Sequence, residues 1–152
     1  MARDEKSDSG SGGRQGDELA DLGWVDWSKG LAYSFRDLLR NNPQSIALFY
    51  SRSAIAPGSL KVVEDSIQGL LLAGFTPAES LFTFQTIFCF VLGHAAFHYS
   101  RRTPQSWAQD GSYRELPALG QLPPLGQLSV EEEFEFGLSA LISGLATRLA
   151  PH

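Results

Sequence analysis

The stretch over residues 81–97 constrains the fold most, because it carries no formally charged side chain. Three residues just before it form a helix start. Thr76 is a capping residue, Pro77 takes the first helical position, and Glu79 lies three residues after the cap. We therefore predict one long helix over residues 76–102.

Apolar side chains occur on every side of this predicted helix. One face holds Phe82, Thr86, Gly93 and Phe97, and a second holds Phe84, Ile87 and Val91. A helix that is apolar all round must be covered all round, by the same chain, by a partner or by a membrane. The stretch is near the short limit for a membrane span and contains Gln85 and His94. We predict a buried helix and no membrane.

Hydrophobic residues at helical spacing predict four further helices, over residues 26–40, 42–51, 59–73 and 129–149. Gly74 is the expected left-handed terminator of the third, and Ser129 with Glu132 opens the last as a capping box. A short helix is also possible over residues 113–119, in a leucine-containing stretch that we expect to lie against the body. No strand-period run is present, so the prediction is an all-α bundle of five to six helices.

Composition narrows the class of protein. The chain of 152 residues suits one domain, and its net charge of −5 argues against a nucleic-acid-binding surface. Its single cysteine, Cys89, excludes an internal disulfide and favours a cytoplasmic setting. Residues 1–22 are polar and rich in Gly and Ser, which predicts a disordered leader before a domain at 23–152.

Few residues suggest chemistry. His94 and His98 lie four apart, a helical spacing that can hold a metal, with residues 131–135 as the source of a third ligand. No metalloprotease or other diagnostic metal pattern accompanies them. The expected role of the two imidazoles is contact with the last helix, an interface or solvent. We predict no metal, no cofactor and no catalytic residue.

Aromatic residues are dense for a chain of this size, with ten Phe, four Tyr and three Trp. Apolar walls with a few polar groups describe a small-molecule pocket. Aromatic stripes on helices also describe an ordinary core. The pattern alone leaves both interpretations open.

Three stretches carry a resemblance to a known family. They are LLLAGFTPAESL (residues 70–81), FVLGHAAF (90–97) and EEEFEFGLSALISGLATRL (131–149). From Trp27 onward the chain resembles the C-terminal effector-binding and dimerisation domain of tetracycline-repressor-type (TetR/AcrR) regulators. That family also carries an N-terminal helix-turn-helix domain. The leader is too short to form one, so we expect no direct nucleic-acid contact from this chain.

The resemblance implies a pocket and a dimer. The implied ligand-binding residues are Phe35, Tyr50, Val63, Ser66, Ile67, Leu81, Phe84, Gln85 and Phe88. The implied residues of a four-helix dimer interface are Gly93, Phe97, Phe134, Gly137, Ala140, Leu141 and Gly144. The polar groups that orient tetracycline are not matched, which implies a hydrophobic or planar effector.

The expected function is therefore a non-catalytic, homodimeric module that binds a small hydrophobic or aromatic effector. One alternative is a pocket recruited as an enzyme, such as a cyclase, with His94, His98 and Tyr99 as the first candidates. A second alternative is a modulator that heterodimerises with a full-length repressor.

Overall fold

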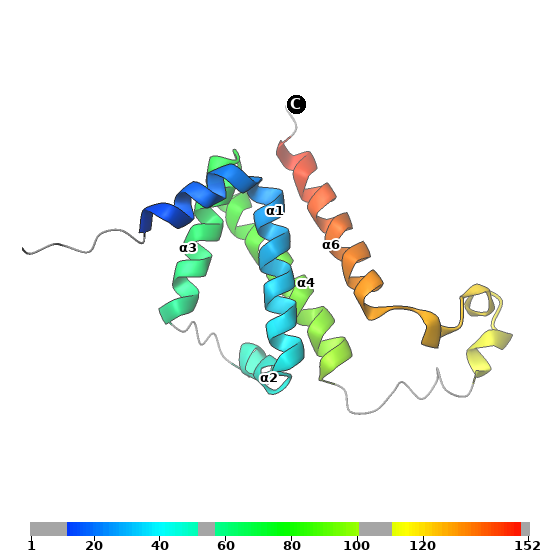
Figure 1. The fold of residues 1–152 in the computed structure, drawn as a ribbon. Helices are drawn as coiled ribbons and strands as arrows, with labels where there is room; N and C mark the ends of the chain where they lie inside the picture. The colour runs from blue at the N-terminus through cyan, green and yellow to red at the C-terminus, as the bar shows by residue number, and fades with distance from the viewer. Residues whose placement is uncertain (1–11, 52–56, 101–110, 150–152) are drawn as a thin grey trace, which may run out of the picture.

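The computed structural model describes residues 12–51, 57–100 and 111–149 and is built from helices (Figure 1). Its α-helices are α1 (Gly12–Asn41), α2 (Gln44–Ser51), α3 (Pro57–Leu72), α4 (Pro77–Tyr99) and α6 (Val130–Ala146). Short 3-10 turns occupy Ser112–Glu115, Leu119–Gln121, Leu125–Gln127 and Thr147–Leu149. Within these described ranges there is no strand, so the prediction of an all-α fold with five to six helices is confirmed.

Helix α4 is the centre of the arrangement. Helices α1, α3 and α4 contact one another, α2 touches α1 and α4, and α6 packs on α4. Figure 1 shows α3 and α6 on opposite sides of the α1–α4 pair. The sides of α4 therefore meet different neighbours.

The start of α4 forms as its sequence predicts. Glu79 N donates to Thr76 Oγ1 at 3.3 Å, and Thr76 N donates to Glu79 Oε2 at 3.1 Å, which completes a reciprocal capping box. The Thr76 N–H and the Thr76 hydroxyl both donate to Glu79 Oε2, and these two bonds lower the pKa of the Glu79 carboxyl. The helix ends at Tyr99, with Ser100 as its C-cap. The predicted end at residue 102 lies outside the described residues.

The turn between α3 and α4 has a defined, hydrogen-bonded backbone geometry. Gly74 has φ 105°, the left-handed conformation expected of it. Its N–H donates to Leu71 O at 3.0 Å, and Phe75 N donates to Leu70 O at 3.2 Å. This pair of bonds is a Schellman motif. The turn buries Phe75 edge-on against Trp24, with ring centroids 5.1 Å apart.

Helix α1 begins earlier than the sequence predicts. A disordered leader was expected over residues 1–22, but the backbone is helical from Gly12. Gly23, with φ 66° and ψ 151°, breaks the helix into two segments at the predicted domain boundary. Helix formers such as Glu18, Leu19 and Ala20 favour the first segment. The prediction for residues 1–11 lies outside the described part of the chain.

Helix α6 packs on the body through its buried residues Phe134, Leu138 and Ile142. Phe134 is completely buried, and its ring lies 5.4 Å from that of Phe90 on α4. A Cβ atom added at Gly137 would lie 2.6 Å from Phe90 Cε2. Gly137, expected at a dimer contact, thus permits close packing of α6 on α4 within one chain. On the α1 side, the Tyr33 hydroxyl donates to Glu135.

Three of the leucines between α4 and α6 do not lie against the body as expected, whereas Leu119 is half-buried. Leu116, Leu122 and Leu128 are 55%, 43% and 53% exposed. The 3-10 turns of this segment hydrogen-bond mainly within themselves, as in Gly120 N to Leu116 O at 2.7 Å. Local backbone bonding therefore orders the turns without burying these side chains.

Helix α4 is long and apolar enough to cross a membrane by length and composition alone, with a mean hydropathy of 1.5. Core helices of soluble proteins pass the same test. Here α1, α3 and α6 all pack against α4, and Ile87, Val91 and Ala95 are buried. A second face of α4 points to solvent, where Phe82 is 62% exposed and Phe97 is 43% exposed.

Candidate functional site

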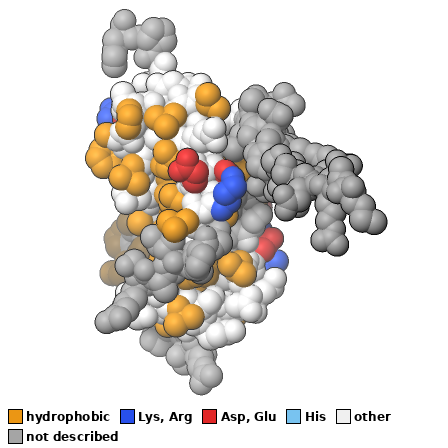
Figure 2. Space-filling model, turned by 90° about the vertical axis from the view of Figure 1, so that its left-hand side faces the viewer, with side chains coloured by type: hydrophobic (Ala, Val, Ile, Leu, Met, Phe, Trp, Pro, Cys, Tyr) orange, Lys and Arg blue, Asp and Glu red, His pale blue; other side chains and the backbone are white. Residues whose placement is uncertain are grey.

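A cavity of about 430 Å³ lies between α1, α3 and α4, with one residue of α2 at its wall. Its lining is almost entirely apolar. The lining residues are Trp27, Ser28, Leu31, Ala32, Ser34, Phe35, Leu38, Phe49, Ser59, Val62, Val63, Ser66, Leu70, Phe84, Ile87, Phe88 and Val91. Figure 2 views the molecule from the α3 side and shows hydrophobic side chains gathered over much of this face.

Helical spacing explains why these residues meet. On α1, Trp27, Leu31 and Leu38 recur with Phe35 on one face. On α4, residues 84, 87, 88 and 91 form the facing stripe. Two such stripes on packed helices normally interdigitate. Here they leave a cavity between them, and residues of α3 line its third side.

Four phenylalanine rings form the aromatic wall. The rings of Phe35 and Phe88 stack with centroids 4.9 Å apart and an interplanar angle of 14°. Phe49 stands edge-on to Phe35 at 5.3 Å, and Phe84 lies stacked 6.2 Å from Phe88. Rings held against each other in this way present flat, fixed apolar surfaces, which suit a planar ligand.

Polar groups at the cavity are few. Ser66 is 3% exposed; its hydroxyl donates to Val62 O at 2.7 Å and lies 3.5 Å from Trp27 Nε1. Ser28 is also buried. The lining contains no Asp, Glu, Lys, Arg or His among the described residues. The site can therefore orient a ligand by one or two hydrogen bonds but has no acid–base pair.

The residues expected to bind ligand divide into two groups. Phe35, Val63, Ser66, Phe84 and Phe88 line the cavity. Tyr50, Ile67, Leu81 and Gln85 lie outside its lining; Ile67 is half-buried and the other three are exposed.

Sequence reasoning missed most of the α1 wall and the second half of the α4 wall. The hydrophobic spacing that would have identified these lining residues is present in both helices. Trp27, Leu31 and Leu38 share the spacing of Phe35, and Ile87 and Val91 each follow a lining residue by three.

The expected interface residues lie on α4 and α6. Phe134 is in the core and Leu141 is half-buried, whereas Gly93, Ala140 and Gly144 are exposed, as is Phe97. Phe136, which sequence reasoning missed, is 79% exposed on α6. It precedes Ala140 and Gly144 by four and eight residues, so the three share one side of the helix.

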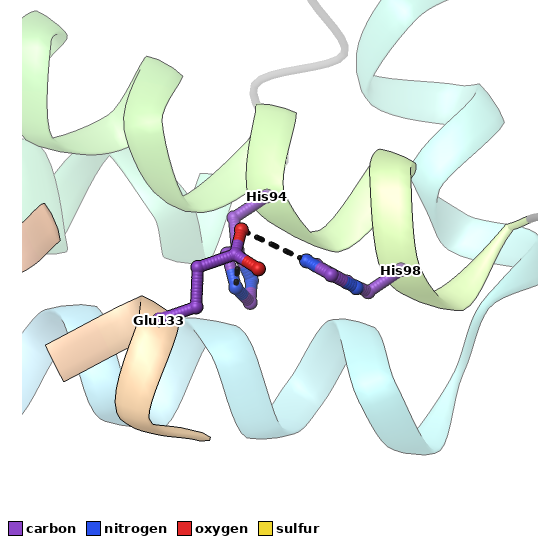
Figure 3. A group of neighbouring side chains, drawn as sticks. All are labelled: His94, His98 and Glu133. Carbon is purple, nitrogen blue, oxygen red and sulfur yellow. Dashed lines mark hydrogen bonds and ion pairs between the residues drawn. The ribbon is translucent and has the colours of Figure 1, made fainter. Parts of the chain in front are cut away.

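The two histidines meet the first turn of α6 (Figure 3). His98 Nε2 lies 3.0 Å from Glu133 Oε1, and His94 Nε2 lies 3.9 Å from the same oxygen. Burial lowers the pKa of His94, and the neighbouring charges of His98 and Arg36 lower it further, against the opposite effect of Glu133. The backbone of Val130 also opposes the shift, and the net direction favours the neutral imidazole at His94. Neither histidine lines the cavity.

The described residues thus form an all-α bundle with a partly open apolar cavity between α1, α3 and α4. Residues 18–149 match the family described as tetracyclin repressor-like, C-terminal domain, so the chain belongs to this family. It is a ligand-binding and dimerisation regulatory domain of the TetR family, whose regulators are soluble cytoplasmic proteins. Comparison with curated proteins finds no match to the chain.

Proposed function

We propose that the cavity binds a small hydrophobic, planar effector and that the chain acts as a cytoplasmic homodimer. The observation that carries the effector proposal is the aromatic cavity itself. Its volume of about 430 Å³ falls within the roughly 300–1,000 Å³ typical of small-molecule pockets. Stacked Phe35 and Phe88 offer a flat surface, and Ser66 offers a hydroxyl.

The lining argues against the enzyme alternative. General acid–base catalysis needs a titratable group within hydrogen-bond reach of the reacting atom. The residues at the cavity wall offer serine hydroxyls and one indole N–H instead. His94, His98 and Tyr99, the first catalytic candidates, do not line the cavity. A binding site without a catalytic step therefore agrees better with the residues of the cavity wall than an active site does.

A thermal-shift series tests the effector proposal. Planar polycyclic aromatic compounds are expected to raise the Tm of the chain, because a ligand that binds only the native state stabilises it by mass action. At about 100 times Kd the gain is about 2.7 kcal/mol, or a rise of about 5–10 °C for a domain of this size. Flexible, highly charged compounds of equal mass are the control. No rise with any planar compound, or an equal rise with the controls, counts against the proposal.

The homodimer proposal rests on an apolar outer face. C-terminal domains of this family commonly dimerise. In this chain the exposed side of α4 carries Phe82, Gly93 and Phe97, and the exposed side of α6 carries Phe136 and Gly144. Small residues beside exposed aromatic rings allow helices of two copies to approach closely across a two-fold axis.

Sedimentation equilibrium tests this interface. The chain is expected to be a dimer at micromolar concentration, and Phe136→Glu is expected to make it a monomer, since it places a charge in an apolar contact. Leu48→Glu is the matched control, because Leu48 is 64% exposed on α2 and is not part of the exposed faces of α4 and α6. A monomeric parent chain, or a Phe136→Glu variant that still dimerises, contradicts the interface.

A further inference from the structure

Three side chains from two helices converge at one point outside the cavity. His94 and His98 extend from successive turns of α4, and Glu133 reaches them from the first turn of α6 (Figure 3). One nitrogen from each imidazole and one carboxylate oxygen all lie within 4.8 Å of one another. The cluster takes no part in the proposed effector site.

The distances suit a small tetrahedral metal ion. Zn²⁺ binds His nitrogen and carboxylate oxygen at about 2.0–2.2 Å, so neighbouring ligand atoms of a tetrahedron lie about 3.4 Å apart. The separations from Glu133 Oε1 are 3.0 Å to His98 Nε2 and 3.9 Å to His94 Nε2. The first distance is shorter and the second is longer than the tetrahedral spacing of about 3.4 Å between ligand atoms. An ion would need only small movements of exposed Glu133.

The state of His94 points to a ligand independently of these distances. Its side chain is only 4% exposed, and its polar neighbours, the backbone of Val130 and the Glu133 carboxylate, leave both ring nitrogens without a hydrogen bond of normal geometry. A buried polar group without a partner is costly, and each one calls for an explanation such as an ion.

The surrounding charges permit a cation. Glu131 and Glu132 accompany Glu133 in the first turn of α6, and His98 lies in the last turn of α4, where the helix dipole favours positive charge. Two cations lie close to this turn: Arg40, whose Nη1 is 3.7 Å from Glu131 Oε1, and Arg36, whose charge acts on His94. The Arg36 guanidinium is occupied, since Arg36 Nη2 lies 3.0 Å from Asp37 Oδ1.

We propose that His94, His98 and Glu133 bind Zn²⁺, with the fourth position open to water, and that the ion fastens α6 to α4. Two imidazoles and one carboxylate suit zinc better than magnesium or calcium, which prefer oxygen ligands alone. The bound ion would lie beside the packing of Phe134 and Phe90 and would hold the first turn of α6 in place. This site is independent of the effector proposal.

Titration of the metal-depleted full chain with zinc chloride tests the site. Calorimetry is expected to give a stoichiometry of one ion per chain, and saturating zinc is expected to raise the Tm by about 5–10 °C. Co²⁺ should bind with the visible absorption of a four-coordinate complex. His98→Ala and Glu133→Gln each remove one ligand and should weaken binding by at least about tenfold, since even outer-shell changes cost about that much.

Glu132→Gln is the matched control. It lies in the same turn of α6 and removes the same charge, but Glu132 is not in the cluster. The control should bind zinc as the parent chain does. Circular dichroism of each metal-free variant verifies folding, and His98 and Glu133 are partly exposed, with side chains 16% and 58% accessible. Failure of the parent chain to bind zinc, or equal binding by all three variants, overturns the proposal.

Discussion

Replacing Ser66 with phenylalanine is expected to weaken effector binding by at least about 100-fold, equivalent to about 2.8 kcal/mol. Ser66 is buried at the cavity wall, so the added ring occupies the space that a planar ligand needs. The indole N–H of Trp27 loses only a long contact of 3.5 Å. Calorimetric titration with the compound that gives the largest Tm rise measures the effect.

Two further variants make this result specific. Gln68→Phe adds the same ring to the exposed side of α3, outside the lining, and should leave the affinity unchanged. Val63→Phe adds a ring inside the cavity while it keeps the Ser66 hydroxyl, and should reduce the affinity as well. Unchanged binding by both cavity variants, or equal loss in Gln68→Phe, would place the ligand elsewhere.

Truncating Phe134 to alanine is expected to lower the free energy of unfolding by about 3–5 kcal/mol. The side chain is completely buried, its ring lies 5.4 Å from Phe90 and 5.8 Å from Tyr33, and the Arg36 guanidinium lies 4.8 Å from its centroid. Alanine leaves a cavity where α1, α4 and α6 meet. Because domains are stable by only about 5–15 kcal/mol, the loss is a large share of the total.

Urea unfolding at one fixed chain concentration measures this loss, since the stability of an oligomer depends on concentration. Leu72→Ala is the control, because Leu72 is 69% exposed and its truncation should change stability by no more than about 0.5 kcal/mol. A loss below about 1 kcal/mol in Phe134→Ala would mean that α6 does not pack on the body as described.

Local signals in the sequence predicted the helices well. The capping residues Thr76 and Glu79, the terminator Gly74 and the cap Ser129 act over three or four residues, so their geometry follows from the sequence alone. Three stretches of the sequence indicated the tetracycline-repressor family, and the family match over residues 18–149 confirms that prediction. The helical backbone between Gly12 and the break at Gly23 was not predicted, because residues 1–22 are polar and rich in Gly and Ser, a composition typical of disorder.

The candidate cavity was harder to predict for a physical reason. Helix α4 is apolar on every face, so its pattern does not say which side meets α1 and α3. The family resemblance assigned Leu81 and Gln85 to the pocket by matched position, whereas Ile87 and Val91 line the cavity. The meeting of His94 with Glu133 could not be predicted at all, because it depends on how α6 packs against α4.

A crystal structure of the chain with its best-binding planar compound tests the central claim most directly. The account predicts electron density for the compound inside the cavity, stacked on Phe35 or Phe88 and within hydrogen-bond reach of Ser66. Density for the compound on the outer faces of α4 and α6, with the cavity between α1, α3 and α4 collapsed or filled by side chains, would contradict it.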